Sequence, residues 1–302
     1  MKDNPKGIFC STIIPTINRG TLTTTVHSVL DQAFKTAEHQ VIVVNDSGTP
    51  LPYMEWHSCE RVRIVDTNRR ERSIARNTGA AVAKGDYLHF LDDDDILLPG
   101  ALEVFWQLAQ NAPSAAWLYG SYRNVDNEGR QVHEFHPAIE GNLFPLLVSG
   151  EGIPLQVSLL RAKEFRAVGG FDPNPVITGV EDRDLGRRIA LIGTVAYSPT
   201  VVGQIRIGEQ GSTTNWSKIA EGDRVGREKA LGERNAFSRI RSGITSDYWR
   251  GRVSRAWFAS AVWNAKRRNI ATAASRGING LATANWHWIA PSFWKGLKTK
   301  IV

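Results

Sequence analysis

The chain has 302 residues, of which 42% are hydrophobic and 22% are charged, and its formal net charge is +7. This length and composition are enough for one large domain or two medium ones, and they exclude a collagen-like, a disulfide-stapled and a mostly disordered chain. No apolar run reaches the roughly 18 residues of a membrane-spanning helix, and the two cysteines, Cys10 and Cys59, favour a reducing compartment.

Strands and helices alternate over about the first 110 residues. Short apolar runs predict strands at residues 8–14, 41–44, 62–65 and 87–91. The first run is short and is interrupted by Pro15, which is typical of a first strand and not of a signal peptide. Apolar periodicity predicts helices at residues 22–30, 73–84 and 98–110. This alternation favours an α/β fold with a mostly parallel, doubly wound sheet flanked by helices.

The remainder of the chain is less regular. Residues 117–170 show no clear pattern before a short helix at 161–168, and a further helix is expected from Glu181 to about Leu191. Strands are predicted at residues 195–197 and 201–207. From about residue 217 a helical extension follows, with breaks expected near Gly243, residues 277–280 and Pro291.

The charge divides the chain at about residue 215. Residues 216–302 carry 17 Lys and Arg against 5 Asp and Glu, a net of +12, whereas residues 1–215 have a net of −5. The basic segment also holds seven of the ten tryptophans. Basic residues interleaved with Trp fit an anionic membrane surface, and a helical subdomain that packs its indoles on the body is the alternative. We therefore predict two regions, a body at 1–215 and a basic helical region at 216–302.

Four consecutive aspartates follow the predicted strand at 87–91. The carboxyl ends of parallel strands line the ligand crevice of an open α/β sheet, so Asp92, Asp93, Asp94 and Asp95 are expected there. Adjacent carboxylates repel one another unless a cation relieves them, and Mg²⁺ or Mn²⁺ commonly bridges carboxylates to substrate phosphates. The cluster therefore predicts a metal–diphosphate site. A solvated acidic turn is the alternative.

Two other predicted strands end on the same edge of the sheet. Pro15, Thr16, Asn18 and Arg19 follow the first, and residues 45–48 follow the second. The Asp46 carboxylate can accept a hydrogen bond from the imide N–H of a uracil or thymine ring. Each segment taken alone is also compatible with a plain turn.

The ordered set of motifs resembles a bacterial family 2 glycosyltransferase with the GT-A fold over about residues 8–215. The matching segments are Pro-Thr-Ile-Asn-Arg at 15–19, Val-Val-Asn-Asp-Ser-Gly at 43–48, Ala-Arg-Asn-Thr-Gly-Ala at 75–80, Phe-Leu and four Asp at 90–95, Gly-Gly-Phe-Asp at 169–172 and Glu-Asp-Arg-Asp-Leu at 181–185. The resemblance implies a nucleotide-sugar donor, UDP- or dTDP-linked, an inverting transfer, and a Mg²⁺ or Mn²⁺ cofactor.

The resemblance also assigns roles to residues. Asp182 matches the general base, and Asp94 and Asp95 match the metal-binding positions. The implied donor-nucleotide site consists of Pro15, Thr16, Asn18, Arg19, Asp46, Arg76, Asp92, Asp93 and Asp94. Phe171, in a turn expected to be exposed, and the acidic residues Glu181 and Asp184 are acceptor or auxiliary candidates, with packing of Phe171 and a helix N-terminus as the alternatives.

Three positions depart from the family pattern. Ile17 stands where the family has an aromatic residue, which predicts weaker packing against the nucleobase. The order Ser47-Gly48 replaces Gly-Ser, and residues 208–212 lack the histidine that the family often carries there. A further metal ligand in that segment is therefore in doubt.

The implied acceptor is a glycan or a lipid-linked glycan of cell-surface polysaccharide, O-antigen or glycolipid synthesis. A cytoplasmic protein, attached peripherally to the inner face of the membrane through residues 216–302, is expected, and a homo-oligomer is left open. The alternatives are a non-catalytic nucleotide- or carbohydrate-binding module, a nucleotidyltransferase and a nucleic-acid binder. The body's acidity and the lack of a binding motif argue against nucleic acid.

Overall fold

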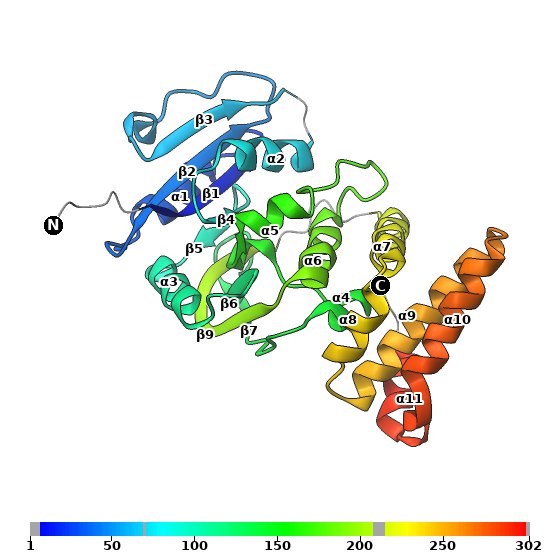
Figure 1. The fold of residues 1–302 in the computed structure, drawn as a ribbon. Helices are drawn as coiled ribbons and strands as arrows, with labels where there is room; N and C mark the ends of the chain where they lie inside the picture. Colours follow the sequence, from blue (N-terminus) through cyan, green and yellow to red (C-terminus); the bar gives the residue numbers. More distant parts are fainter. Residues whose placement is uncertain (1–6, 69–70, 208–214, 300–302) are drawn as a thin grey trace.

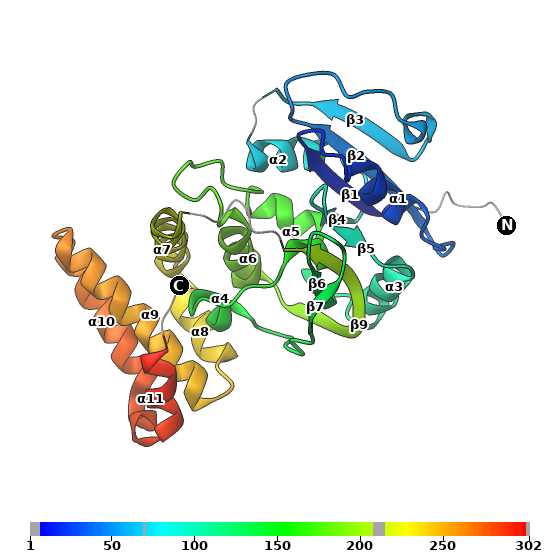
Figure 2. The same ribbon diagram turned by 180° about the vertical axis from the view of Figure 1, so that it is seen from behind.

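The computed structural model describes residues 7–68, 71–207 and 215–299 (Figure 1). One curled, mixed sheet forms its centre, with strand order β3-β2-β1-β4-β8-β6-β9-β5 and with β7 paired to β6. Helices cover both faces of the sheet, and the helices after residue 215 lie at the end of the molecule away from β3 (Figures 1 and 2).

The first half of the sheet is parallel, as the alternating pattern predicts. Its strands are β1 (Ile8–Thr16), β2 (Glu38–Asn45), β3 (Val62–Asp66) and β4 (Tyr87–Phe90), and they are joined through α1 (Leu22–Leu30), the short 3₁₀ helix η1 (Glu55–Ser58) and α2 (Arg72–Val82). Helix α2 packs closely on β1, since a Cβ at Gly79 would lie 2.5 Å from the Ile13 side chain. The loops after β1, β2 and β4 therefore meet at one edge of the sheet.

The second half of the sheet is mixed, and the sequence pattern predicted only its last strand in chain order, in two pieces. Its strands are β5 (Ile96–Leu97), β6 (Trp117–Val125), β7 (Gln131–Phe135), β8 (Ser158–Arg161) and β9 (Val195–Arg206). Strand β8 runs antiparallel to both β4 and β6, whereas β9 runs parallel to β6. The two strands predicted at 195–197 and 201–207 are one strand, β9, whose register against β6 shifts near Ser198. The helices of this half are α3 (Ala101–Asn111), α4 (Phe144–Val148), η2 (Leu155–Val157), α5 (Ala162–Ala167) and α6 (Glu181–Ile192).

The chain after residue 215 is helical, as predicted. Its elements are α7 (Trp216–Gly232), α8 (Ala236–Gly243), α9 (Asp247–Lys266), α10 (Ile270–Ala284), the 3₁₀ helix η3 (Asn285–Ile289) and α11 (Pro291–Lys298). The break expected at 277–280 is wrong, because α10 runs through both glycines. Gly280 is needed where the Phe258 ring of α9 lies against the backbone, so it marks a close helix contact instead of a helix end.

These helices share their core with the body. Leu231 of α7, Ile240 of α8 and Trp257 of α9 are buried in the same apolar cluster as Leu185 and Ile189 of α6. Trp257 follows the packing alternative, because its indole fills this interface. None of the helices in the described ranges combines the length and apolar character needed to cross a membrane.

Candidate active site

The four aspartates form a tight turn at the carboxyl end of β4. The backbone N–H of Asp95 donates to the carbonyl of Asp92 at 3.1 Å, which closes the turn. Asp93 and Asp95 are buried, whereas the side chains of Asp92 and Asp94 are each about 30% exposed. The turn thus presents two carboxylates to solvent and keeps two inside the fold.

The loop after β1 holds the outer side of this turn. The Thr16 hydroxyl donates to Asp93 at 2.6 Å, and the Thr21 hydroxyl donates to the Asp93 carbonyl at 2.6 Å. Arg19 lies 3.3 Å from Asp93 and also forms an ion pair with Asp94. Asn18 has a left-handed backbone, with φ of 68°, and its N–H donates to the Thr16 hydroxyl. The predicted donor-site loop is therefore built onto the acidic turn.

The loop after β2 adds a third component. The Asp46 N–H donates to the Thr16 carbonyl at 2.8 Å, and the Asp46 carboxylate accepts from the Thr67 hydroxyl at 2.6 Å. Pro15 lies opposite Val44 in the β1–β2 ladder, so it fixes the base of both loops. The structure brings Asp46, Thr16 and the acidic turn together, while their role in nucleotide binding stays a prediction.

Arg76 links the acidic turn to the predicted base. From the middle of α2 its guanidinium donates to Asp92 at 2.7 Å and to Glu181 at 3.0 Å, and it lies over the Phe171 ring. Arg76 and Glu181 are both buried. Burial alone would lower the pKa of Arg76, but Asp92 and Glu181 outweigh it and raise that pKa. Arg76 therefore joins the loop after β4 to the first turn of α6.

The carboxylates of the site differ in charge preference. Burial raises the pKa of Asp93 and of Asp94, and burial together with Asp92 raises the pKa of Asp95 well above its usual range. At Asp92 burial acts in the same direction, but the Arg76 guanidinium outweighs it and holds the pKa low. Asp95 is therefore a costly buried charge that a cation would stabilise.

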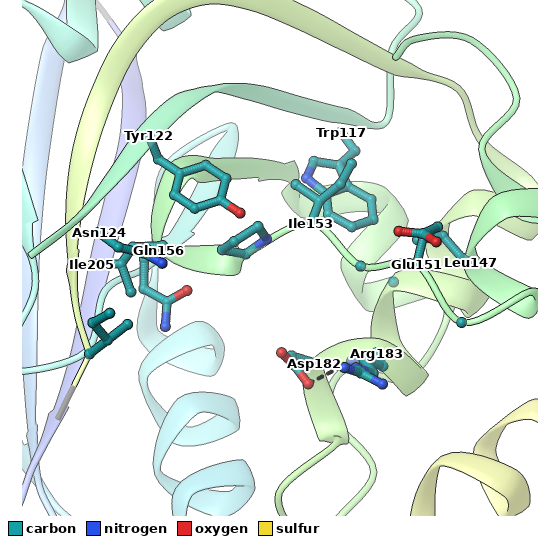
Figure 3. Close-up of a pocket in the computed structure, with 15 residues that line it drawn as sticks. Trp117, Tyr122, Asn124, Leu147, Glu151, Ile153, Gln156, Asp182, Arg183 and Ile205 are labelled. Carbon is teal, nitrogen blue, oxygen red and sulfur yellow. Dashed lines mark hydrogen bonds between the residues drawn. The ribbon is translucent and has the colours of Figure 1, made fainter. Parts of the chain in front are cut away.

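Asp182 lies in a cavity of about 410 Å³ beside this network (Figure 3). The cavity wall includes Trp117, Tyr122, Ile153 and Gln156, and the Asp182 carboxylate points into it near the Gln156 amide. Burial and the neighbouring Glu181 raise the pKa of Asp182, whose Oδ1 accepts a hydrogen bond from the Arg183 N–H. A carboxylate in this position can accept a proton from a bound hydroxyl group.

Gln156 is a site residue that sequence analysis missed. Its side-chain amide donates to Asp92 at 2.8 Å, and its main-chain carbonyl oxygen lies 2.9 Å from His89 Nε2. Gln156 thus contacts both the acidic turn and the cavity of Asp182. It stands in the stretch that showed no periodic pattern, in the middle of a three-residue 3₁₀ turn, so no sequence signal marks it.

The three auxiliary candidates have structural roles. Phe171 is 1% exposed and packs against Phe90 and Phe165, which corrects the expectation of an exposed turn that stacks on a sugar. Glu181 is bound by Arg76, and Asp184 is buried and paired with Arg188 at 2.6 Å. None of these three side chains lines the cavity of Asp182.

The family resemblance implies a divalent cation, which stays a prediction, and Asp94 and Asp95 of the acidic turn are the residues that would hold it. Among the described residues no group of three His, Cys, Asp or Glu side chains could hold a metal alone. Asp94 and Asp95 would therefore supply at most two ligands, with phosphate and water completing the shell, which is the usual arrangement for Mg²⁺ with a phosphorylated substrate. The segment 208–212, where the family often has a histidine, lies outside the described residues.

Comparisons with known proteins relate part of this chain to a known family. The family model described as Glycosyl transferase family 2 matches residues 11–157. Poly(ribitol-phosphate) β-N-acetylglucosaminyltransferase TarP of Staphylococcus aureus is 34% identical over 128 residues, covering 40% of this chain and 38% of TarP. Chondroitin synthase of Escherichia coli is 31% identical over 111 residues, covering 35% of this chain and 16% of the synthase. The chain thus spans less than half of the length of these curated relatives.

A solved structure covers more of the chain. Residues 1–349 of S. aureus TarS in complex with UDP-GlcNAc superpose with a TM-score of 0.60, covering 89% of this chain and 90% of that one, at 13% sequence identity. At this identity the match shows the fold alone. It extends the likeness beyond the segment that the family model covers.

Proposed function

We propose that this chain, whose residues 11–157 match glycosyltransferase family 2, transfers a sugar from a nucleoside diphosphate donor to an acceptor hydroxyl with inversion. The observation that carries the proposal is the cavity that holds both Asp182 and Gln156, the latter bonded to Asp92 of the acidic turn. The proposed base thus lies in a cavity whose wall residue Gln156 is bonded to a donor-side carboxylate. TarS binds UDP-GlcNAc, which makes UDP-sugars the first donors to test, before dTDP-sugars.

The donor would lie along the loops after β1, β2 and β4. Asp46 and Thr16 are suited to the base, and the acidic turn is suited to the ribose and diphosphate. Asp94 and Asp95 would hold Mg²⁺ or Mn²⁺, which offsets the charge that develops on a leaving diphosphate. Arg76 would position Asp92 without touching the donor, since its guanidinium is buried and bonded to Asp92 and Glu181.

Asp182 is suited to the role of general base. In the proposed step the acceptor oxygen forms the new bond to the anomeric carbon, and the bond from that carbon to the donor diphosphate breaks. The hydroxyl proton moves to the Asp182 carboxylate, and the bonding electrons leave with the diphosphate. A carboxylate with a raised pKa is a better proton acceptor than an ordinary aspartate.

The acceptor would occupy the cavity of Asp182. Its walls combine the rings of Trp117 and Tyr122 with the polar groups of Asn124, Glu151 and Arg183. Such a mixture suits a sugar ring, which presents apolar C–H faces and polar edges. We propose a glycan or lipid-linked glycan of a cell-surface polysaccharide as the acceptor class, in keeping with the relatives named above.

The experiment separates donor binding from transfer. Thermal shifts with UDP-, dTDP-, GDP- and CMP-sugars, with and without Mn²⁺, identify the donor, and release of the nucleotide diphosphate in the presence of glycan acceptors measures turnover. Asp182→Asn is expected to keep the thermal shift and to lose a factor of about 10²–10⁴ in rate. Asp31→Asn, on the exposed end of α1, is the matched control. Near-normal transfer by Asp182→Asn would disprove the assignment, and donor binding without any turnover would favour a binding module.

A further inference from the structure

Helices α9, α10 and α11, with η3 between the last two, form a unit whose charged side chains are basic except for Asp247. Asp247 is the last acidic residue of the chain, and ten Lys and Arg follow it. In both views α10 is the outermost element of the molecule, on the side away from β3 (Figures 1 and 2). The surface of α9–α11 is therefore cationic and far from the acidic body's first strands.

Several of these cations form hydrogen bonds within the protein, so not all of the basic residues are available to an anionic surface. Arg252 is buried and donates to Glu151 and to the Ser149 carbonyl. Arg250 and Arg255 donate to main-chain carbonyls of Thr283 and Leu297. These three arginines hold the helices together and onto the body, so they cannot be the groups that meet a partner.

Large apolar side chains are exposed at the end of α10 and on the elements after it. Trp286 is 61% exposed, Trp288 56% and Ile289 64%. Ile278 and Leu281, one turn apart on α10, and Trp294 of α11 are exposed as well. Trp294 Nε1 donates to the Trp288 carbonyl at 2.6 Å, which brings α11 against η3. We call these six residues the α10–α11 patch.

The charged side chains of α10 and α11 are basic, and Asp247 of α9, an acidic neighbour of the patch, is paired with His287 at 2.6 Å. Lys295 and Lys298 are exposed on α11, next to Trp294. The one charged residue of α10, Arg276, donates to the Leu231 carbonyl and lies over the Trp257 ring, so its charge faces the protein. The patch therefore presents indoles and aliphatic side chains with lysines beside them.

We propose that the α10–α11 patch is a docking surface for an anionic lipid bilayer, on which the protein lies peripherally. Indoles favour the headgroup level of a bilayer, aliphatic side chains enter the acyl boundary, and lysines meet lipid phosphates. Asp247, the one acidic residue of α9–α11, is paired with His287, and every later charged residue of this unit is basic.

Two other occupants fit the patch less well. A second copy of the chain, placed symmetrically, would bring two cationic units together, which costs energy. A nucleic acid would use the lysines and indoles, but it offers no apolar surface to Ile278, Leu281 and Ile289. The aliphatic part of the patch therefore favours lipid.

Flotation of the full chain with vesicles tests the proposal. We expect binding to phosphatidylcholine vesicles that contain 30% phosphatidylglycerol, and much weaker binding to phosphatidylcholine alone. Trp286→Ser with Trp288→Ser should lower the partition coefficient roughly tenfold or more. Lys295→Glu with Lys298→Glu should lower it at least about thirtyfold on the anionic vesicles. Trp216→Ser, which removes an equally exposed indole from α7, is the matched control.

Each other outcome overturns the proposal. Absence of flotation, or flotation that both double variants retain, would exclude the patch as the lipid contact. A dimer in light scattering that the double variants abolish, without vesicle binding by the wild type, would assign the patch to a second copy. Retention of a short RNA without vesicle binding would assign it to nucleic acid. Unchanged melting temperatures of the variants establish that they are folded.

Discussion

His89 is expected to make the stability of this protein fall as the pH drops below 6.5. The imidazole is fully buried in β4, with Nδ1 3.2 Å from the Thr12 hydroxyl and Nε2 2.9 Å from the Gln156 carbonyl. Burial lowers the pKa of His89 from 6.5 to about 4, and the bond to Gln156 opposes this only in part. The folded protein thus keeps the ring neutral.

The sign of the effect follows from linkage. Below pH 6.5 the unfolded chain binds a proton at His89 and the folded chain does not, so the unfolded state is favoured until the pH reaches about 4. Over this window the free energy of unfolding should fall by about 1.4 kcal/mol per pH unit, or about 3 kcal/mol in all. Above pH 6.5 the contribution is constant.

His89→Gln isolates this contribution. We expect the variant to be less stable than the wild type at pH 7.5 by about 1 kcal/mol, because a buried hydrogen bond is impaired. Urea titrations between pH 7.5 and pH 4.5 should then show the two stabilities approaching each other as the pH falls. The rest of the acid sensitivity is common to both proteins and cancels in the difference. Parallel stability curves would refute the reasoning, since they would mean that His89 does not resist protonation in the folded state.

Other predictions concern the site and the C-terminal helices. Glu181→Gln should lower the pKa of Asp182, so the acidic limb of the pH profile of kcat/KM should move to lower pH; a limb that does not move would contradict the coupling. Arg76→Gln should cost about 3–5 kcal/mol of unfolding free energy, because it leaves two carboxylates without their cation, and denaturant titration measures this loss. Gly251→Ala should destabilise the contact of α9 with α11, because a Cβ there would overlap a main-chain carbonyl. Gly277→Ala, on the open surface of α10, should raise the free energy of unfolding by up to about 1 kcal/mol, since alanine favours a helix more than glycine does. Equal melting temperatures for the two alanine variants would disprove this packing.

The sequence was sufficient for the parallel half of the sheet and for the edge where the site lies. Residues 15–19, 45–48 and 92–95 could be grouped because parallel strands end on one side. The link from Arg76 to Glu181 could not be foreseen, since it joins residues 105 positions apart and depends on how α2 packs against α6. Gln156 was missed for a similar reason, because an antiparallel strand brings it back to Asp92.

Burial was harder to foresee than position. Phe171 follows two glycines, a sequence typical of an exposed turn, yet the ring closes a cluster with Phe90 and Phe165. Trp257 belongs to a basic, aromatic segment but fills the interface with α6 and α8. In both cases the neighbouring residues in the sequence indicate the backbone conformation, whereas the residues that bury the ring are far away in the sequence.

The buried Arg187 has a consequence for how this protein can be divided. From α6 its guanidinium reaches the Leu147 carbonyl of α4 and the Asp223 carboxylate of α7, at 3.0 and 2.5 Å. A chain cut at residue 215 would lose Asp223 and leave the Arg187 guanidinium buried without its carboxylate partner. Arg187 lies on α6, the helix whose first turn contains Asp182. Helix α7 therefore completes the packing of the body, although it follows the body in the sequence. A minimal folded fragment of this protein should include α7.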